Sequence, residues 1–257
     1  MFKKLGLQVY TVRDHIKDEE SMDATFKRLA EIGYSELQTA GWESETYAKL
    51  AKKYGHTIVG THYNYDKIIN NIDETMKLHE VLGTTNVGIG GCGARTYEDI
   101  MKFIENYNKA AEIYAKNGFK LTYHNHSFEF VEVKDGKSTM DLLVEGLDPE
   151  KTSFVLDTCW VANAGGDVCG WLEKLAGRID ILHLKDLKVN FADEGKWAVR
   201  QQLCEIGNGN LAWDRILKSA EATGVKHIVV EQDNFWIDND PFKSLEFSKK
   251  YLDQFLG

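Results

Sequence analysis

Four short apolar runs in the second half of the chain each end in ionisable residues. An unpaired charge costs several kcal/mol to bury, so such groups rarely end buried strands unless they have a common partner. If the four strands belong to one barrel, their ends converge, and a divalent metal ion would stabilise that arrangement. The apolar runs are 119–121, 154–156, 179–182 and 227–230, and the polar groups near their ends are Tyr123-His124-Asn125-His126, Asp157-Thr158-Cys159-Trp160, His183-Leu184-Lys185-Asp186 and Glu231-Gln232-Asp233.

The chain is built from repeated strand-then-helix units, and several of the predicted helices end at a glycine just before the next apolar run. Eight such units with short loops predict a single (β/α)8 TIM barrel domain over residues 1–257. A doubly wound sheet would carry a glycine-rich phosphate loop after the first strand, and residues 10–14 contain no glycine. The other predicted strands are 5–10, 35–39, 57–62 and 86–89, and the predicted helices are 19–32, 44–54, 66–82, 96–117, 139–145, 167–175, 212–222 and 241–256.

Composition excludes several classes of function. The net charge is −9 and there is no run of lysine or arginine, which argues against a nucleic-acid partner. No apolar stretch approaches the roughly 20 residues that span a bilayer, and the first residues do not form an apolar signal segment. The four cysteines lack CxxC spacing, so neither a zinc ribbon nor a disulfide framework is indicated. We therefore expect a cytoplasmic protein without a membrane partner.

In a barrel of this kind the chemistry lies at the carboxyl ends of the strands. Asp157, His183 and Glu231 occupy such positions, and His124 and His126 share one face of the fifth strand. Two carboxylates and one or two imidazoles suit one divalent ion, with Mn²⁺ expected first and Co²⁺, Zn²⁺ or Mg²⁺ as alternatives. Taken alone, Asp157 is equally compatible with a helix N-cap.

Four motifs, together with Gly6-Leu7-Gln8 and Gly33-Tyr34-Ser35-Glu36, carry a resemblance to a known family. The order His-Asn-His, Leu-Asp-Thr, His-Leu-Lys-Asp and Val-Glu-Gln-Asp resembles the xylose isomerase-like TIM barrels, over essentially the whole chain. The run Tyr-His-Asn-His-Ser-Phe-Glu-Phe is similar to the branch of sugar phosphate isomerases and epimerases. The superfamily also contains inosose dehydratases and metal-dependent apurinic endonucleases.

The resemblance implies a metal site made by Glu, Asp, His and Glu at the ends of strands five to eight. Asp157, His183 and Glu231 match the last three positions. At the first position this chain has His124 where many relatives have glutamate. Either His124 is the ligand, which we favour, or Glu129 reaches back from the following loop.

The implied chemistry is proton abstraction next to a carbonyl through a metal-stabilised enediolate. We expect Glu231 to be the base, His126 or Glu129 to return the proton, and Lys185 to stabilise the enediolate. Four further residues are expected to contact a carbohydrate substrate, namely Trp160, His62, Gln8 and Glu36. The leading function is therefore a sugar isomerase or epimerase, and the alternative is a lyase that acts on an inosose or a 3-keto-glycoside. A homo-oligomer is compatible with the family.

Overall fold

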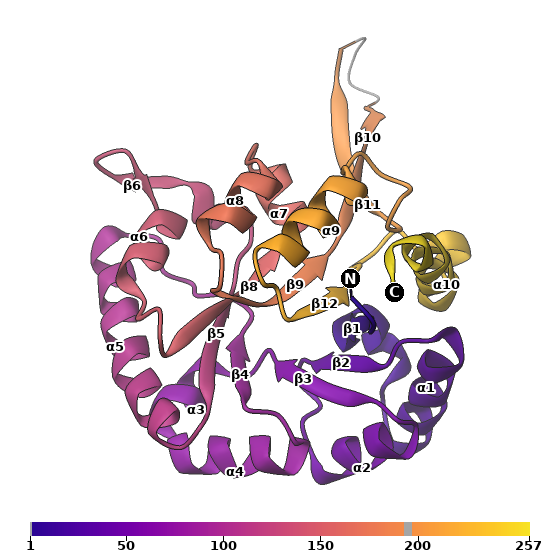
Figure 1. Ribbon diagram of the computed structural model, residues 1–257, viewed down its shortest axis with the longest axis horizontal. Coiled ribbons are helices and arrows are strands. Elements are labelled where there is room, and N and C mark those ends of the chain that lie inside the picture. Colours follow the sequence, from indigo (N-terminus) through magenta and orange to yellow (C-terminus); the bar gives the residue numbers. More distant parts are fainter. Residues whose placement is uncertain (1, 193–196) are drawn as a thin grey trace.

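The computed structural model describes residues 2–192 and 197–257, so residue 1 and residues 193–196 of the predicted domain lie outside the described part. Eight parallel strands form a nearly closed barrel within a ring of helices (Figure 1), which confirms the predicted fold class. Their order is β3-β2-β1-β12-β9-β8-β5-β4. The strands are β1 (Gly6–Gln8), β2 (Glu36–Thr39), β3 (Thr57–Thr61), β4 (Asn86–Ile89), β5 (Lys120–His124), β8 (Thr152–Asp157), β9 (Ile179–Leu184) and β12 (His227–Val230).

The barrel closes between β3 and β4, the two ends of the strand order. The backbone nitrogen of Tyr63 donates to the carbonyl of Gly88 at 2.7 Å, and the nitrogen of Gly88 donates to Thr61 Oγ1 at 3.3 Å. A Cβ atom on Gly88 would lie 2.3 Å from the carbonyl oxygen of Thr61. Only glycine therefore permits the two strands to approach this closely.

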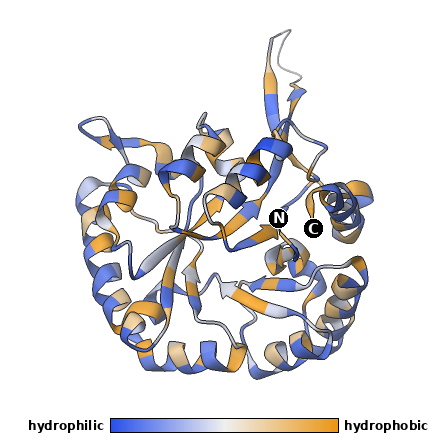
Figure 2. Cartoon of the chain, in the orientation of Figure 1, coloured by the Kyte–Doolittle hydropathy of each residue, from blue (hydrophilic) through white to orange (hydrophobic). Residues whose placement is uncertain are grey.

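Helices with polar caps surround the barrel, and Figure 2 shows hydrophilic and hydrophobic residues alternating along them. Asp18 and Ser138 each form a capping box at the start of the helix that follows. The α-helices are α1 (Glu19–Ile32), α2 (Glu45–Lys53), α3 (Tyr65–Asn70), α4 (Ile72–Leu82), α5 (Tyr97–Lys116), α6 (Thr139–Gly146), α7 (Thr158–Asn163), α8 (Val168–Lys174), α9 (Trp213–Ala222) and α10 (Pro241–Leu252), and the 3-10 helices are η1 (Val9–His15), η2 (Phe128–Phe130), η3 (Ile237–Asn239) and η4 (Asp253–Phe255).

Two local predictions were wrong, and two hairpins were missed. The first strand ends at Gln8 rather than at residue 10, because the Gln8 side chain accepts a hydrogen bond from Tyr10 N and caps η1. The predicted helix 66–82 is divided into α3 and α4 by the non-helical backbone of Asn71. Two hairpins were not predicted, namely β6 (Glu132–Lys134) with β7 (Lys137–Ser138) and β10 (Asp186–Phe191) with β11 (Val199–Cys204).

The packing inside the barrel supports its carboxyl end. Val155, Ile181 and Val229 form a buried cluster with Val59. Each of the first three lies two residues before a polar strand-end residue and therefore shares its face of the strand. A much larger core fills the space between the sheet and the helices. None of the helices in the described ranges is both long and apolar enough to cross a membrane.

Candidate metal centre and active site

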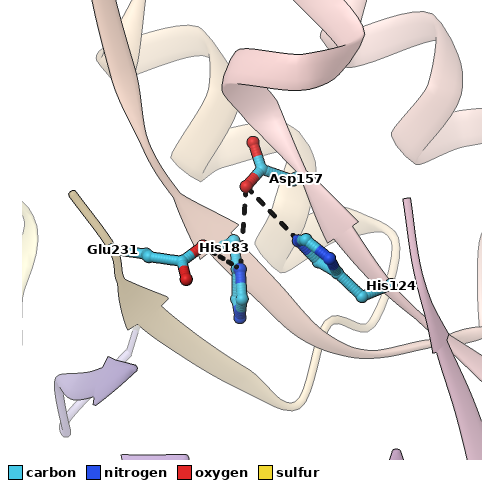
Figure 3. Close-up of side chains that lie close together, drawn as sticks. All are labelled: His124, Asp157, His183 and Glu231. Atoms are coloured by element: carbon cyan, nitrogen blue, oxygen red, sulfur yellow. Dashed lines mark hydrogen bonds and ion pairs between the residues drawn. The ribbon is translucent and has the colours of Figure 1, made fainter. Parts of the chain in front are cut away.

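Four buried side chains meet at the carboxyl end of the barrel. His124 ends β5, Asp157 ends β8, His183 lies in β9 and Glu231 follows β12, and each offers one ligand atom within 4.8 Å of the others. Figure 3 shows their polar ends directed at a common point. Asp157 Oδ2 lies 3.5 Å from His124 Nε2 and 3.6 Å from His183 Nδ1, while Glu231 Oε2 lies 3.0 Å from the same His183 nitrogen.

The second nitrogen of His183 is held by Gln38 on β2. His183 Nε2 donates to Gln38 Oε1 at 2.5 Å, because a side-chain carbonyl can only accept. In the neutral imidazole, Nδ1 is then a lone pair that faces the cluster. This nitrogen is buried and makes no hydrogen bond of acceptable geometry, although a carboxylate oxygen lies 3.0 Å away.

His124 repeats this arrangement. Its Nδ1 lies 3.5 Å from the backbone carbonyl of Gly90, and its Nε2 lies 3.5 Å from Asp157 Oδ2. In the tautomer with the proton on Nδ1, the ring donates to Gly90 and Nε2 is a lone pair that faces Asp157. In these tautomers, two imidazole lone pairs and two carboxylates point toward one another. Such a set is repulsive unless a cation lies between them, and its donors suit a borderline divalent ion. The residues present therefore fit a metal ion.

The electrostatics of the cluster favour positive charge. Burial alone would raise the pKa of Asp157, but Lys185 and the two histidines outweigh it and hold the pKa well below its ordinary value. Burial would lower the pKa of His183, but the carboxylates of Glu231 and Asp157 raise it above its ordinary value. Either a proton on His183 or a divalent ion would supply the positive charge that these carboxylates favour.

Lys185 brings a second positive charge to the site. Its Nζ lies 2.9 Å from Glu231 Oε2, 2.9 Å from Asp233 Oδ2 and 3.6 Å from Asp157 Oδ2. Burial opposes the charge on Lys185, but the three carboxylates outweigh burial and raise its pKa. The ammonium ion is therefore a fixed charge beside the cluster. The neighbouring residue in sequence, Asp186, instead accepts a hydrogen bond from Trp213 Nε1 at 2.6 Å.

A cavity of about 400 Å³ opens beside the four side chains. His124 and Glu231 form part of its wall, so the cluster is accessible to a small molecule. The cavity also contains His126 and Lys185, which the sequence predicted, and Asp233 and Tyr10, to which no role had been assigned. It is lined by Tyr10, Ala40, His62, Gly90, His124, His126, Lys185, Glu231 and Asp233.

Glu129 faces away from the ligand cluster. Its carboxylate accepts from Tyr123 OH at 2.8 Å and from the backbone nitrogen of His126 at 2.7 Å. Burial raises the pKa of Glu129 to about 7. Of the two sequence alternatives for the first ligand, the structure therefore places His124 at the cluster, and Glu129 instead anchors the backbone of His126.

Three of the four expected substrate contacts lie at the correct end of the barrel. His62 follows β3, and its Nε2 is buried without a hydrogen-bond partner. Gln8 contacts His62, with 3.4 Å between its Nε2 and His62 Nδ1. The ring of Trp160 lies next to two residues that line the cavity. Its centroid is 5.7 Å from that of His126 and 4.9 Å from Lys185 Nζ.

Glu36, the fourth expected substrate contact, lies at the opposite end of the barrel. Glu36 is the first residue of β2, at the amino end of the barrel, where its carboxylate lies 2.9 Å from His227 Nδ1. Gln38, two residues later on the same face, reaches the site instead. The alternation of Glu36-Leu37-Gln38-Thr39 could have indicated Gln38, since both polar residues share one face. Asp233 belongs to the last polar motif of the sequence, but its contact with Lys185 depends on the fold and could not be predicted.

Comparison with known proteins identifies a family whose model matches most of the chain. The model of the family described as xylose isomerase-like TIM barrel matches residues 26–251. Similar proteins include inosose dehydratases from Geobacillus thermodenitrificans, 25% identical over 171 residues, and Bacillus licheniformis, 29% identical over 173 residues. Each match covers 63% of this chain and 56% of the relative. The chain thus spans just over half the length of these curated relatives.

Solved structures share the fold over nearly the whole chain. One sugar phosphate isomerase/epimerase from Parabacteroides distasonis has a TM-score of 0.79 at 25% identity and covers 98% of this chain and 94% of that one. A second from the same organism has a TM-score of 0.81 at 22% identity, with 98% of both chains covered. A probable 3-DHS dehydratase from Bacillus anthracis, with a TM-score of 0.71 at 14% identity, covers 97% of this chain and 98% of that one.

Proposed function

The chain belongs to the xylose isomerase-like TIM barrel family, and we propose that it is a metal-dependent isomerase or epimerase that acts on a keto-sugar. One observation carries the proposal. One ring nitrogen each of His124 and His183 and one carboxylate oxygen each of Asp157 and Glu231 lie within 4.8 Å of one another, beside a cavity of about 400 Å³. That volume suits a small polar ligand.

The four side chains would hold one divalent ion, which supplies stabilisation of the negative charge that develops on a substrate carbonyl oxygen. The residues around it have separate tasks. Glu231 lines the cavity and is the proposed base that removes the proton next to the carbonyl. Lys185, 2.9 Å from Glu231, places a second positive charge beside the reacting carbon and oxygen.

His126 is the proposed partner of Glu231. The two residues follow β5 and β12, which are separated in the sheet by β8 and β9, so they approach the cavity from different sides. Burial lowers the pKa of His126 to about 4, so its imidazole is neutral at pH 7. To return a proton to the substrate, it would first take one from water in the cavity that it lines. Groups on two sides of a substrate permit inversion at one carbon, which is what an epimerase requires.

The charges favour a keto-sugar over a sugar phosphate. Among the described residues that line the cavity, Lys185 is the one lysine or arginine. It already pairs with Glu231 and Asp233 and lies near Asp157. A phosphate dianion would therefore lack a free cationic side chain, whereas hydroxyl groups can bind His62 and Asp233.

A dehydratase is the second candidate, because the curated relatives are named inosose dehydratases. Elimination of water begins with the same proton abstraction. In the next step a dehydratase expels a hydroxyl group as water, whereas an isomerase or epimerase returns a proton to carbon. Product mass separates the two reactions, since an isomer keeps the mass of its substrate and a dehydratase product has lost water.

The test is solvent deuterium exchange at the carbon next to the carbonyl, measured on a panel of keto-sugars, inososes and 3-keto-glycosides. Glu231→Gln should lower exchange by about 100-fold or more. Glu80→Gln, at an exposed position on α4, is the matched control and should keep the parent rate. Exchange that persists at the parent rate in Glu231→Gln would exclude Glu231 as the base.

A further inference from the structure

The β10–β11 hairpin carries a concentrated patch of exposed apolar side chains. It extends outward beyond the ring of helices (Figure 1). Phe191 is 83% exposed and Trp197 is 89% exposed, and Val189 and Val199 are also exposed. Among the described residues, Phe191 and Trp197 are the two most exposed large hydrophobic side chains. Patches of this kind mark interaction sites.

The strand register places the apolar residues on one face. Val189 pairs with Gln201, and Phe191 pairs with Val199. Cross-strand partners point to the same side, so the outer part of this face carries Val189, Phe191 and Val199 together with the uncharged Gln201. Trp197 lies in the turn two residues before Val199, next to the outer end of this face. We call these five residues the hairpin face.

The opposite side of the hairpin is polar. Lys188, Asn190, Arg200 and Gln202 alternate with the residues of the hairpin face. Asn190 Nδ2 donates to Gln202 Oε1 across the two strands at 3.0 Å. A ribbon with one polar and one apolar side is the pattern of a sheet whose apolar side is covered.

The base of the hairpin is firmly attached to the barrel. Asp186, the first residue of β10, accepts hydrogen bonds from Trp213 Nε1 at 2.6 Å and from Gly207 N at 3.0 Å. Val189 N donates to Asn210 Oδ1 at 2.9 Å. Among the hairpin residues that the structure describes, 190–192 and 197–200 make no hydrogen bond to the barrel, and an isolated two-stranded ribbon is marginally stable in water. The hairpin is therefore anchored at one end and presents an uncovered apolar surface at the other.

We propose that the hairpin face is the contact surface of a homodimer, and that it packs on the hairpin face of a second copy of this chain. A two-fold axis brings the same patch of both copies together, so one apolar surface meets its own complement. No residue of the hairpin face is charged, so this contact creates no like-charge repulsion. Lys188 and Arg200 remain on the outer sides, in contact with water.

The available area of the hairpin face can be compared with what a specific dimer needs. Phe191 and Trp197 together can bury roughly 300–500 Å² per copy. Two copies with their valines reach about 1,000 Å², which is near the lower limit for a specific interface. Because the hairpin extends beyond the helices, two hairpins can meet without contact between the barrels.

The test is the mass of the intact protein in solution at micromolar concentration, by light scattering after gel filtration. The wild type should have about twice the 29.2 kDa mass of one chain. The double variant Phe191→Glu/Trp197→Glu should be a monomer, because four carboxylates would meet at the contact. The milder Val199→Asn should weaken dimerisation by about 100-fold or more, the effect of two lost buried valines, one from each copy.

Two controls separate the hairpin face from other surfaces. Ile113→Glu introduces the same charge at an exposed apolar residue of α5, and Arg200→Glu changes the polar side of the hairpin. Both should remain dimers. A wild type that is monomeric under these conditions would overturn the proposal. A dimeric double variant with a native circular dichroism spectrum would do so as well.

Discussion

The side-chain carbonyl of Gln38 on β2 lies 2.5 Å from Nε2 of His183 on β9, and this contact decides which nitrogen of His183 faces the ligand cluster. A carbonyl oxygen requires a donor, so the proton of the neutral imidazole lies on Nε2 and the lone pair on Nδ1. Partners of this kind fix the orientation of metal-binding histidines and increase their basicity. The hydrogen bond therefore links a strand on the other side of the barrel to the proposed metal centre.

Loss of this contact should weaken metal binding. In Gln38→Leu, His183 can adopt the other tautomer or rotate, and we expect metal affinity to fall by about 10- to 100-fold. Competition with a chromophoric chelator measures this change. Gln8→Leu is the matched control, because Gln8 contacts His62 and none of the four proposed ligands. Equal affinities in the two variants would contradict the role given to Gln38.

The charge of Lys185 should matter most when no metal is bound. Lys185→Met leaves Asp157, Glu231 and Asp233 without their common cation, so the metal-free protein should lose about 3–5 kcal/mol of unfolding free energy. Denaturant unfolding in EDTA measures this loss. Added Mn²⁺ should restore more stability to the variant than to the wild type, because it replaces the missing positive charge.

A surface lysine provides the comparison. Lys226 also pairs with a carboxylate, Asp180, at 3.0 Å, but its side chain is 54% exposed. Lys226→Met should therefore cost about 1 kcal/mol or less. Similar losses in the Lys226 and Lys185 variants would show that the three carboxylates around Lys185 do not depend on it.

Glu129 should make stability depend on pH. Its pKa is raised from 4.5 to about 7 by burial, so between these values the folded protein binds a proton that the unfolded chain does not. The unfolding free energy should therefore fall as pH rises from about 4.5 to 7, by up to roughly 3 kcal/mol. Glu129→Gln should flatten the curve of unfolding free energy against pH in this interval, whereas Glu80→Gln should leave its slope as in the wild type. An unchanged slope in Glu129→Gln would assign the pH dependence to other groups.

His126 should affect proton return more than proton removal. In His126→Gln, epimer or isomer formation should fall by about 100-fold or more, while solvent exchange at the carbon next to the carbonyl continues through Glu231. Nuclear magnetic resonance in D₂O follows both events in one sample. Loss of exchange and product formation in equal proportion would place His126 in the first step instead.

Much of the fold could be predicted because the strands and helices follow local rules. Glycine caps, helical spacing and short apolar runs indicate where each element begins and ends. Asp157, His183 and Glu231 could be selected because a buried charge at a strand end needs an explanation. The nature of their neighbours depends on strand order, which brings Lys185 to Asp233 and His124 to Asp157.

What could not be predicted depends on register and on interactions distant in sequence. Glu36 and Gln38 share a face of β2, and only the strand boundary shows that Gln38 is the one at the active end. Glu129 has a carboxylate at a plausible distance in sequence, but its bonds to Tyr123 OH and His126 N direct it elsewhere. In the sequence, the β10–β11 hairpin lies between barrel strands β9 and β12. The alternating apolar residues Val189 and Phe191 are equally typical of a buried strand, so they do not indicate an exposed ribbon.

The central claim is that His124, Asp157, His183 and Glu231 bind one divalent ion, and elemental analysis of the purified protein tests it most directly. After dialysis against a mixture of Mn²⁺, Co²⁺, Zn²⁺ and Mg²⁺ and removal of free ions, the wild type should retain about one ion per chain. Asp157→Ala and His183→Ala should each retain almost none while keeping the circular dichroism spectrum of the wild type. Full occupancy in both variants, or no bound ion in the wild type, would contradict the account.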